Sequence, residues 1–207
     1  MIVLVDIAWI TNEKREICPT QVAAIRNDEG WNSVDSFFSR IKPKNESFHD
    51  WSHIAYSGGK PKDFTNAQSA AFVLLRFLSW LSADDLLCWW NEVPREIFLR
   101  VVDTLLQKKP RQRSVMLKEH ISKSLPNLYV KIQNPYCFAS ALELDVPTNI
   151  HGAFNYVTVM QAVLSALNYP PELLSMKTAR GGEDEIDSLP QMRVLKYFYD
   201  TEARLLH

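Results

Sequence analysis

The stretch "WWNEVPREIFL", residues 89–99, joins a short apolar segment to the first turn of a helix. The segment that leads into it, "DLLCWWN" at residues 85–91, has the length and apolar character of one buried strand. Pro94 is typical of a first helical turn, and the helix is predicted to run from there to about Leu106. A strand followed at once by a helix is a building unit of α/β folds.

Three β-rich segments precede this unit. They read "MIVLVDIAWI", "ICPTQVAAIRNDEG" and "WNSVDSFFSRIKP", and the turn at residues 27–30 and Pro43 end the second and the third. Because the connections are short, three antiparallel strands are the simplest interpretation. Residues 44–68 are polar and contain Gly58-Gly59, which predicts an irregular loop or one short helix. Asn66 is a plausible N-cap for a long helix from Ala67 to about Leu81.

The segments after this unit are mainly helical. We expect helices in "SVMLKEHISKSL", in "CFASALELDV" up to Pro147, and in "GAFNYVTVMQAVLSALNY", with a possible fifth strand in "NLYVKIQ". This order predicts one α/β domain over residues 1–170. An acidic linker over residues 171–187 and a C-terminal helix over residues 188–207 follow, and that helix either folds back or docks on another subunit.

The composition of the chain excludes only a few classes of function. The chain has 207 residues, 46% of them apolar, and a net charge of −1, so it is not a strongly basic polyanion-binding domain. Its three cysteines have no metal-binding spacing and lie in apolar segments, which predicts buried thiols in a reducing compartment. The N-terminus has neither the basic region nor the cleavage site of a signal peptide, and no segment is typical of a membrane span. We therefore expect a cytoplasmic protein without a membrane partner.

Three short patterns occur in a consistent order, "VDIAW", "WNEVPREIFL" and "HGAFNYV". Together with the element order, they resemble the motifs of the DnaQ-like (DEDDh) 3'-5' exonuclease family of the RNase H-like superfamily. The resemblance runs from about residue 2 to residue 167. It implies an α/β, RNase H-like fold with a mixed five-stranded sheet flanked by helices. In that family D-x-E, H-N-x-x-F-D and H-x-A-x-x-D supply four carboxylates that hold two divalent metal ions, and the last histidine is the general base.

The chain departs from the family at the positions that matter for chemistry. Residues that match the motifs are Asp6, Asn91, Phe98, Leu99, His151 and Ala153. Four positions differ: Ala8 replaces the glutamate, Trp90 the second motif's histidine, and Arg95 and Tyr156 the two remaining aspartates. Asp6 and His151 are thus the remnants of the catalytic set that the resemblance implies.

Two-metal hydrolysis of a phosphodiester needs several anionic oxygens to hold two divalent ions, such as Mg²⁺ or Mn²⁺. Ala8 offers no ligand, Tyr156 is a neutral phenol near pH 7, and Arg95 repels cations. The sequence therefore predicts no resident metal, and an ion pair between Asp6 and Arg95 with Tyr156 filling the space. His151 is either a residual general base or a residue kept for hydrogen bonding at the helix start.

One alternative retains activity. If two of the patterns slip by one residue, Asp6, Glu96 and Asn155 form a weak ligand set for Mg²⁺ or Mn²⁺, which would make an active 3'-5' exonuclease. Two independent shifts are then needed, and Ala8 stays unexplained.

Basic residues around the second motif suggest contacts with phosphates. The candidates for nucleic-acid binding are Arg95, Asn91, Lys108, Lys109, Arg111 and Arg113, although a short charge run is also typical of solvated loop surface. The sequence thus favours a catalytically degenerate exonuclease-like domain. Such a domain would bind a single strand or strand end, or serve as a scaffold subunit of a nucleic-acid-processing complex.

Overall fold

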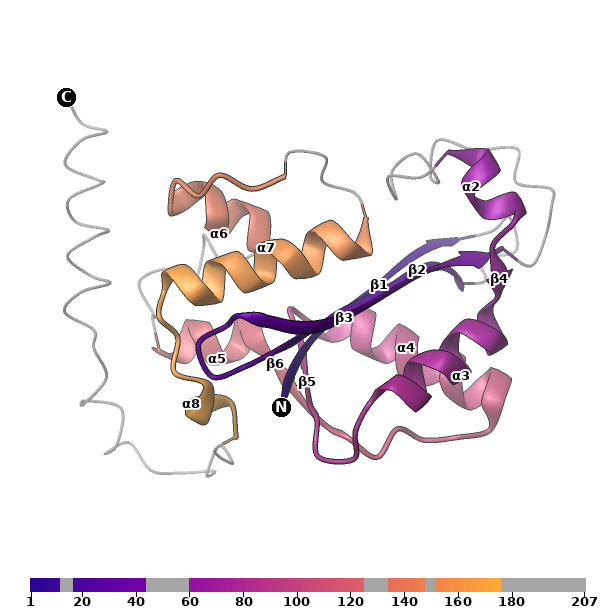
Figure 1. Ribbon diagram of the computed structural model, residues 1–207, viewed down its shortest axis with the longest axis horizontal. Coiled ribbons are helices and arrows are strands. Elements are labelled where there is room, and N and C mark those ends of the chain that lie inside the picture. The colour runs from indigo at the N-terminus through magenta and orange to yellow at the C-terminus, as the bar shows by residue number, and fades with distance from the viewer. Residues whose placement is uncertain (12–16, 44–59, 125–133, 148–151, 176–207) are drawn as a thin grey trace.

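The structure, a computed structural model, describes residues 1–11, 17–43, 60–124, 134–147 and 152–175 (Figure 1). The strands are β1 (Ile2–Thr11), β2 (Ile17–Asn27), β3 (Ser33–Lys42), β4 (Gln68–Ser69), β5 (Leu86–Trp89) and β6 (Arg113–Met116). The helices are α2 (Pro61–Thr65), α3 (Ala70–Trp80), α4 (Glu92–Leu106), α5 (Leu117–Ser124), α6 (Pro135–Ala141), α7 (Ala153–Ala166) and α8 (Pro171–Ser175).

Over these residues the strands form one mixed sheet of six, in the order β4-β3-β2-β1-β5-β6. The first three strands are the predicted antiparallel meander, and β5 and β6 add to β1 in parallel. Parallel neighbours need a crossover connection, and α3 and α4 supply those crossovers. The predicted α/β fold class is thus confirmed, with six strands in place of five.

Strand alternation divides the core into two layers. On β1, Val3, Val5 and Ile7 face α3 and α4, whereas Leu4, Asp6 and Ala8 lie on the face covered by α7. Figure 1 shows α6 and α7 on one side of the sheet and α3 and α4 on the other. Adjacent residues of one strand therefore belong to different sites.

A buried ion-pair cluster ties β2 to the turn before β5. Arg26 Nη2 donates to Asp85 Oδ2 at 2.8 Å and to the Trp80 carbonyl at 2.8 Å, and the guanidinium lies 4.2 Å from the centre of the Trp80 ring. Asp85, 3% exposed, also accepts from the Ser82 amide at 2.8 Å. A carboxylate taken out of water is stable only when charge and hydrogen bonds compensate it, as they do here.

The sequence misplaced the start of α3. Ser69, and not Asn66, is its N-cap, and the Ser69 hydroxyl accepts from the Phe72 amide at 3.4 Å. Gln68 and Ser69 were expected inside the helix, but they pair with Ile41 and Lys42 as a short edge strand. The strand pairing overrides the weaker helical pattern of these two residues.

Strand β6 covers residues 113–116, of which residues 114–116 were predicted to begin a helix. Their pairing with Leu86–Trp89 extends the sheet, and the helix begins only at Leu117. The Lys118 amide donates to the Trp90 carbonyl at 3.0 Å and so fixes the start of α5 against the end of β5. The possible strand in "NLYVKIQ" lies outside the described residues.

Smaller differences concern helix ends and cysteines. Helix α4 begins at Glu92, two residues before Pro94, and α6 ends at Ala141, well before Pro147. Cys18 and Cys88 are buried as predicted, but Cys137 is exposed, because α6 is a surface helix that buries only one side. None of the helices in the described ranges has the length and apolar character to span a bilayer.

The packed core reaches into the predicted linker. In α8, Leu174 is buried in the same cluster as Leu164 and Leu167. The rest of the linker and the predicted C-terminal helix lie outside the described residues.

Candidate functional site

Asp6 is the one acidic residue of the first motif, and its carboxyl is buried beneath α7. The residue is 8% exposed. Burial raises the pKa of Asp6 from 3.8 to about 7, although a hydrogen bond from the backbone of Ile7 opposes this rise. A carboxyl group in such surroundings is protonated much of the time at neutral pH, because burial penalises its charged form.

Two tyrosines lie close to Asp6, one from each helix of this layer. Tyr156 stands in the first turns of α7 and Tyr136 in the first turn of α6, and their ring centres are 5.9 Å apart in an edge-to-face arrangement. Burial, and then the Asp6 charge, raises the pKa of Tyr136 to about 12, and the same two causes raise the pKa of Tyr156 further. Both phenols are therefore neutral at physiological pH.

The start of α7 is held over β2 by Gln21. This side chain is buried, and its Oε1 accepts from the Ala153 amide at 3.0 Å. The first amides of a helix have no partner within the helix, so Gln21 satisfies one of them where no water reaches. Gln21 faces Ala8 across the β1–β2 pair. Sequence reasoning missed this glutamine, since its role depends on a helix more than a hundred residues away.

The second motif forms the junction of β5 and α4. Trp90 is 1% exposed and packs in the same core layer as Leu4 and Val157. Asn91 is the N-cap of α4, but its side chain makes no capping hydrogen bond, and its Oδ1 is buried with no partner in the described part of the chain. Asn91 thus stands at this junction, and its role in nucleic-acid binding stays a prediction.

Arg95 does not meet Asp6. Its Nη1 lies 3.8 Å from Glu92 Oε1 one turn earlier, and no ion pair joins it to Asp6 in the described ranges. The predicted ion pair is wrong because the two residues belong to opposite layers, Asp6 beneath α7 and Arg95 on α4. The motif fixes the place of Arg95 along the chain but not the direction of its side chain.

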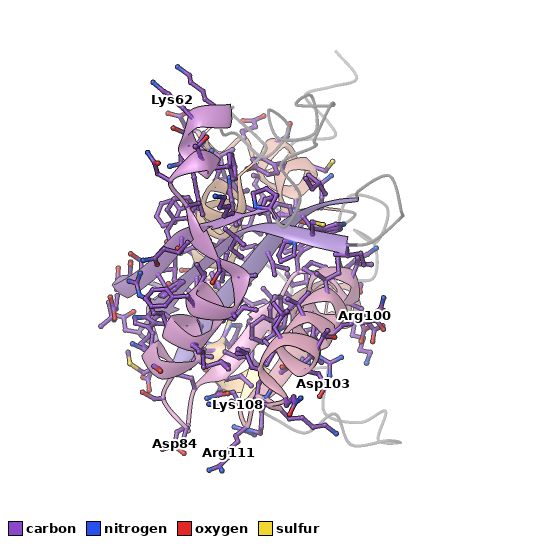
Figure 2. The ribbon with its side chains drawn as sticks, turned by 90° about the vertical axis from the view of Figure 1, so that its right-hand side faces the viewer. Lys62, Asp84, Arg100, Asp103, Lys108 and Arg111 are labelled. Atoms are coloured by element: carbon purple, nitrogen blue, oxygen red, sulfur yellow. The ribbon has the colours of Figure 1, made fainter. Side chains whose placement is uncertain are left out.

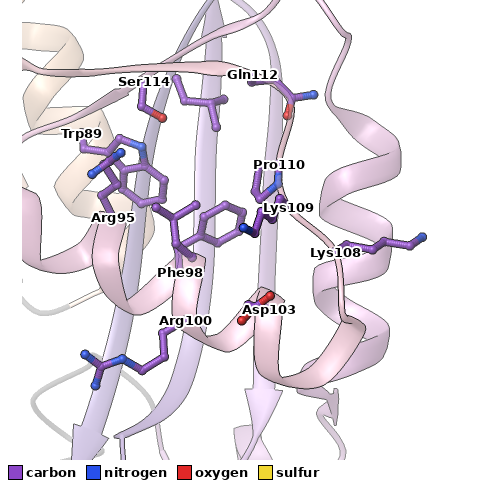
Figure 3. Close-up of a pocket in the computed structure, with 12 residues that line it drawn as sticks. Trp89, Arg95, Phe98, Arg100, Asp103, Lys108, Lys109, Pro110, Gln112 and Ser114 are labelled. Carbon is purple, nitrogen blue, oxygen red and sulfur yellow. The ribbon is translucent and has the colours of Figure 1, made fainter.

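Arg95 lines a cleft of about 510 Å³ between α4, β5, β6 and the connection before β6 (Figure 3). Its residues are Leu87, Trp89, Arg95, Phe98, Leu99, Arg100, Asp103, Lys108, Lys109, Pro110, Gln112 and Ser114. Three of the six candidates for nucleic-acid binding meet here: Arg95, Lys108 and Lys109. Arg100 joins them, and the sequence did not indicate it.

The other basic candidates are exposed nearby. Arg111 and Arg113 are exposed and do not line the cleft. Figure 2 shows Arg100, Lys108 and Arg111 on the side of the molecule that carries α4 and the following connection. Within the cleft itself, Lys109 lies over Phe98, whereas Lys108 points away (Figure 3).

The metal-ligand candidates do not form a group. Glu96 is exposed on α4, while Asp6 is buried beneath α7. Over the described ranges, no three His, Cys, Asp or Glu side chains stand close enough to share an ion. His151 lies outside the described residues.

Comparisons with known proteins show which solved structures have a similar architecture. No protein-family model matches the sequence, and no curated protein matches it either. Among solved structures, the nuclease domain of 3'hExo, a DEDDh family member bound to rAMP, is similar with a TM-score of 0.69 and 11% identity. The match covers 80% of this chain and 90% of that one. The chain has the DEDDh exonuclease fold.

Two further structures agree. The cell-death related nuclease CRN-4 matches with a TM-score of 0.67 and 11% identity, over 80% of this chain and 62% of that one. E. coli Exonuclease I in complex with a dA16 oligonucleotide matches with a TM-score of 0.66 and 15% identity, over 84% of this chain and 42% of that one. The predicted resemblance is confirmed at the level of the fold.

Proposed function

We propose that this chain is an exonuclease-fold domain that binds nucleic acid without hydrolysing it. The observation that carries the proposal is that the described residues gather no metal-binding set of His, Cys, Asp or Glu side chains, and that the neighbours of Asp6 include two phenols that burial keeps neutral. Hydrolysis by two metal ions requires several charged carboxylates in one place, and this face offers one that is easily protonated.

Divalent metal ions do not fit the residues of this face. Mg²⁺ and Mn²⁺ prefer several charged oxygen ligands, and the described residues gather no such set around Asp6. Phenols whose pKa is raised by burial contribute no anionic oxygen near pH 7. We therefore propose that the domain works without Mg²⁺ or Mn²⁺.

Nucleic-acid binding is supported by two further points. The similar structures include nucleases in complex with a histone mRNA stem-loop and with a dA16 oligonucleotide. In this chain, Arg95, Lys108 and Lys109 gather at one cleft, with Arg111 and Arg113 exposed close to them in sequence. Cations gathered in this way contact phosphates, and the resulting affinity falls as salt rises.

The test uses the full chain with end-labelled single-stranded DNA and RNA. We expect no shortening with Mg²⁺, with Mn²⁺ or with EDTA, and a band shift that weakens with salt and in Arg95→Gln. Metal-dependent shortening that disappears in Asp6→Ala would overturn the proposal in favour of an active exonuclease. If the strand is neither shortened nor bound, the scaffold role replaces the binding role, and pull-downs with and without residues 188–207 then test the C-terminal helix. We keep the cytoplasm as the expected compartment.

A further inference from the structure

The cleft beside α4 collects buried polar atoms that lack partners. The described residues contain nine buried side-chain nitrogen or oxygen atoms without a hydrogen-bond partner. Three of these nine belong to residues that line this one cleft, Trp89 Nε1, Arg95 Nε and Gln112 Oε1. A buried polar group left unpaired costs about 1–3 kcal/mol, so such a concentration is typical of a place where a ligand completes the hydrogen bonds.

The charged side chains that line the cleft indicate the chemical class of its ligand. The lining residues include four cations and a single acid, Asp103, and of these cations Lys108 and Arg100 extend away from the other lining side chains in Figure 3. The unpartnered atoms of Trp89 and Arg95 are both N–H donors, and they lie at the same end of the cleft (Figure 3). An anionic group with several acceptor oxygens suits this combination, and a phosphate is such a group.

The rest of the cleft suits the remainder of a nucleotide. Gln112 donates through Nε2 to the Ser82 carbonyl at 3.2 Å, which leaves its Oε1 as an acceptor without a partner. Phe98 and Pro110 supply apolar surface in the same cleft. Its volume of about 510 Å³ falls within the range of small-ligand pockets, roughly 300–1,000 Å³. Trp89 is 0% exposed, so its indole N–H meets a ligand only if Arg95, whose side chain is 33% exposed, turns aside.

We propose that this cleft binds the phosphate of a nucleotide monophosphate, either free or at the end of a strand, on the opposite face of the sheet from Asp6. Arg95 and Lys109 hold the phosphate, the Trp89 indole donates to it when Arg95 turns aside, and Gln112 and Pro110 contact the nucleoside. The inference rests on the proposed function in that it takes the cations of the cleft to serve nucleic-acid binding.

The experiment measures binding of AMP to the full chain by calorimetry, with adenosine and inorganic phosphate as separate probes. We expect AMP to bind more tightly than either probe, and the indole N–H signal of Trp89, assigned with Trp89→Phe, to shift in the NMR spectrum. In Arg95→Gln and Lys109→Gln the affinity for AMP should fall roughly tenfold or more, the effect of losing one charged hydrogen bond. Lys62→Gln removes an exposed charge on α2, at the other end of the molecule from Lys108 (Figure 2), and should leave the affinity within about twofold.

The outcomes separate this inference from the proposed function. Absent binding of AMP, binding no tighter than that of inorganic phosphate, or an equal loss in Lys62→Gln overturns the nucleotide cleft, even if long strands still bind without being cleaved. Cleavage of strands would overturn the proposed function and leave AMP binding to be judged by itself. Competition between AMP and oligonucleotides with a 5'-phosphate, but not with a 5'-hydroxyl, identifies a strand end as the source of the phosphate. AMP binding without such competition identifies a free nucleotide.

Discussion

Two buried carboxyl groups in this domain have opposite surroundings. Asp85 accepts hydrogen bonds from Arg26 and from the Ser82 amide, and it joins β2 to the turn before β5. Asp6 is similarly buried, but its neighbours are the neutral phenols of Tyr136 and Tyr156, and its pKa rises to about 7. Burial alone therefore does not define a site. A buried carboxylate with a cationic partner can remain ionised within the fold, whereas one without a cation destabilises the fold once ionised.

The largest effect is expected at Asp85. Asp85→Ala leaves Arg26 buried without its main acceptor, and the free energy of unfolding should fall by about 3–5 kcal/mol. Urea denaturation at pH 7 measures the change. Asp84→Ala, at the exposed neighbouring position, is the matched control and should stay within about 0.5 kcal/mol of wild type. Equal, small losses at both positions would show that the cluster contributes little.

Asp6→Asn should raise the free energy of unfolding at pH 8, whereas Asp85→Ala lowers it. The folded-state pKa of Asp6 lies above its unfolded value of 3.8, so this group favours the folded state below about pH 4, and that contribution is lost as pH rises to about 7. The neutral amide avoids this loss, and at pH 8 the variant should be more stable than wild type by up to about 4 kcal/mol. Unfolding free energies measured between pH 4 and pH 8 should show a flatter profile for the variant. A less stable variant at pH 8 would mean that an unseen cation compensates Asp6.

A smaller effect is expected at the glutamine that holds α7 over Asp6. Gln21→Ala removes the acceptor of the Ala153 amide at the start of the helix and should lower the free energy of unfolding by about 1 kcal/mol. If the start of α7 then loosens, water reaches Asp6 and the pH dependence described above becomes weaker. An unchanged stability together with an unchanged pH profile would show that α7 is held by packing alone.

The smallest effect is expected at Tyr136, whose hydroxyl is buried without a partner among the described residues. Tyr136→Phe removes an unsatisfied group and should change the free energy of unfolding by no more than about 0.5 kcal/mol, as measured by urea denaturation. A loss of more than about 1.5 kcal/mol would reveal a hydrogen bond to a charged group, with Asp6 the nearest candidate.

Much of the fold could be predicted from the sequence. The alternation of apolar residues in the first three segments and the short turns between them indicated the meander correctly. Strand β6 could not be predicted, because "RSVM" has no alternation of its own and becomes a strand only by pairing with Leu86–Trp89. The cap at Ser69 was missed for the same reason, since an edge pairing with Ile41 and Lys42 decides it.

The candidate site was less predictable than the fold. The motif frame located Asp6, Ala8 and Tyr156, which lie on one face. It could not reveal that Arg95 turns to the opposite face, because that depends on how α4 packs on β5. Tyr136 carries no motif, and only the packing of α6 on α7 brings it to Tyr156. Arg100 and Gln112 likewise become visible only when the cleft is formed.

The central claim is that Asp6 does not hold a metal ion, and titration with Mn²⁺ followed by EPR tests it most directly. The double variant Ala8→Glu with Tyr156→Asp places two more carboxylates on the face of Asp6 and serves as the positive control, which should bind Mn²⁺. Wild type and Asp6→Ala are predicted to give the same titration, with no ion bound at this face. A bound ion in wild type that is lost in Asp6→Ala would contradict the account.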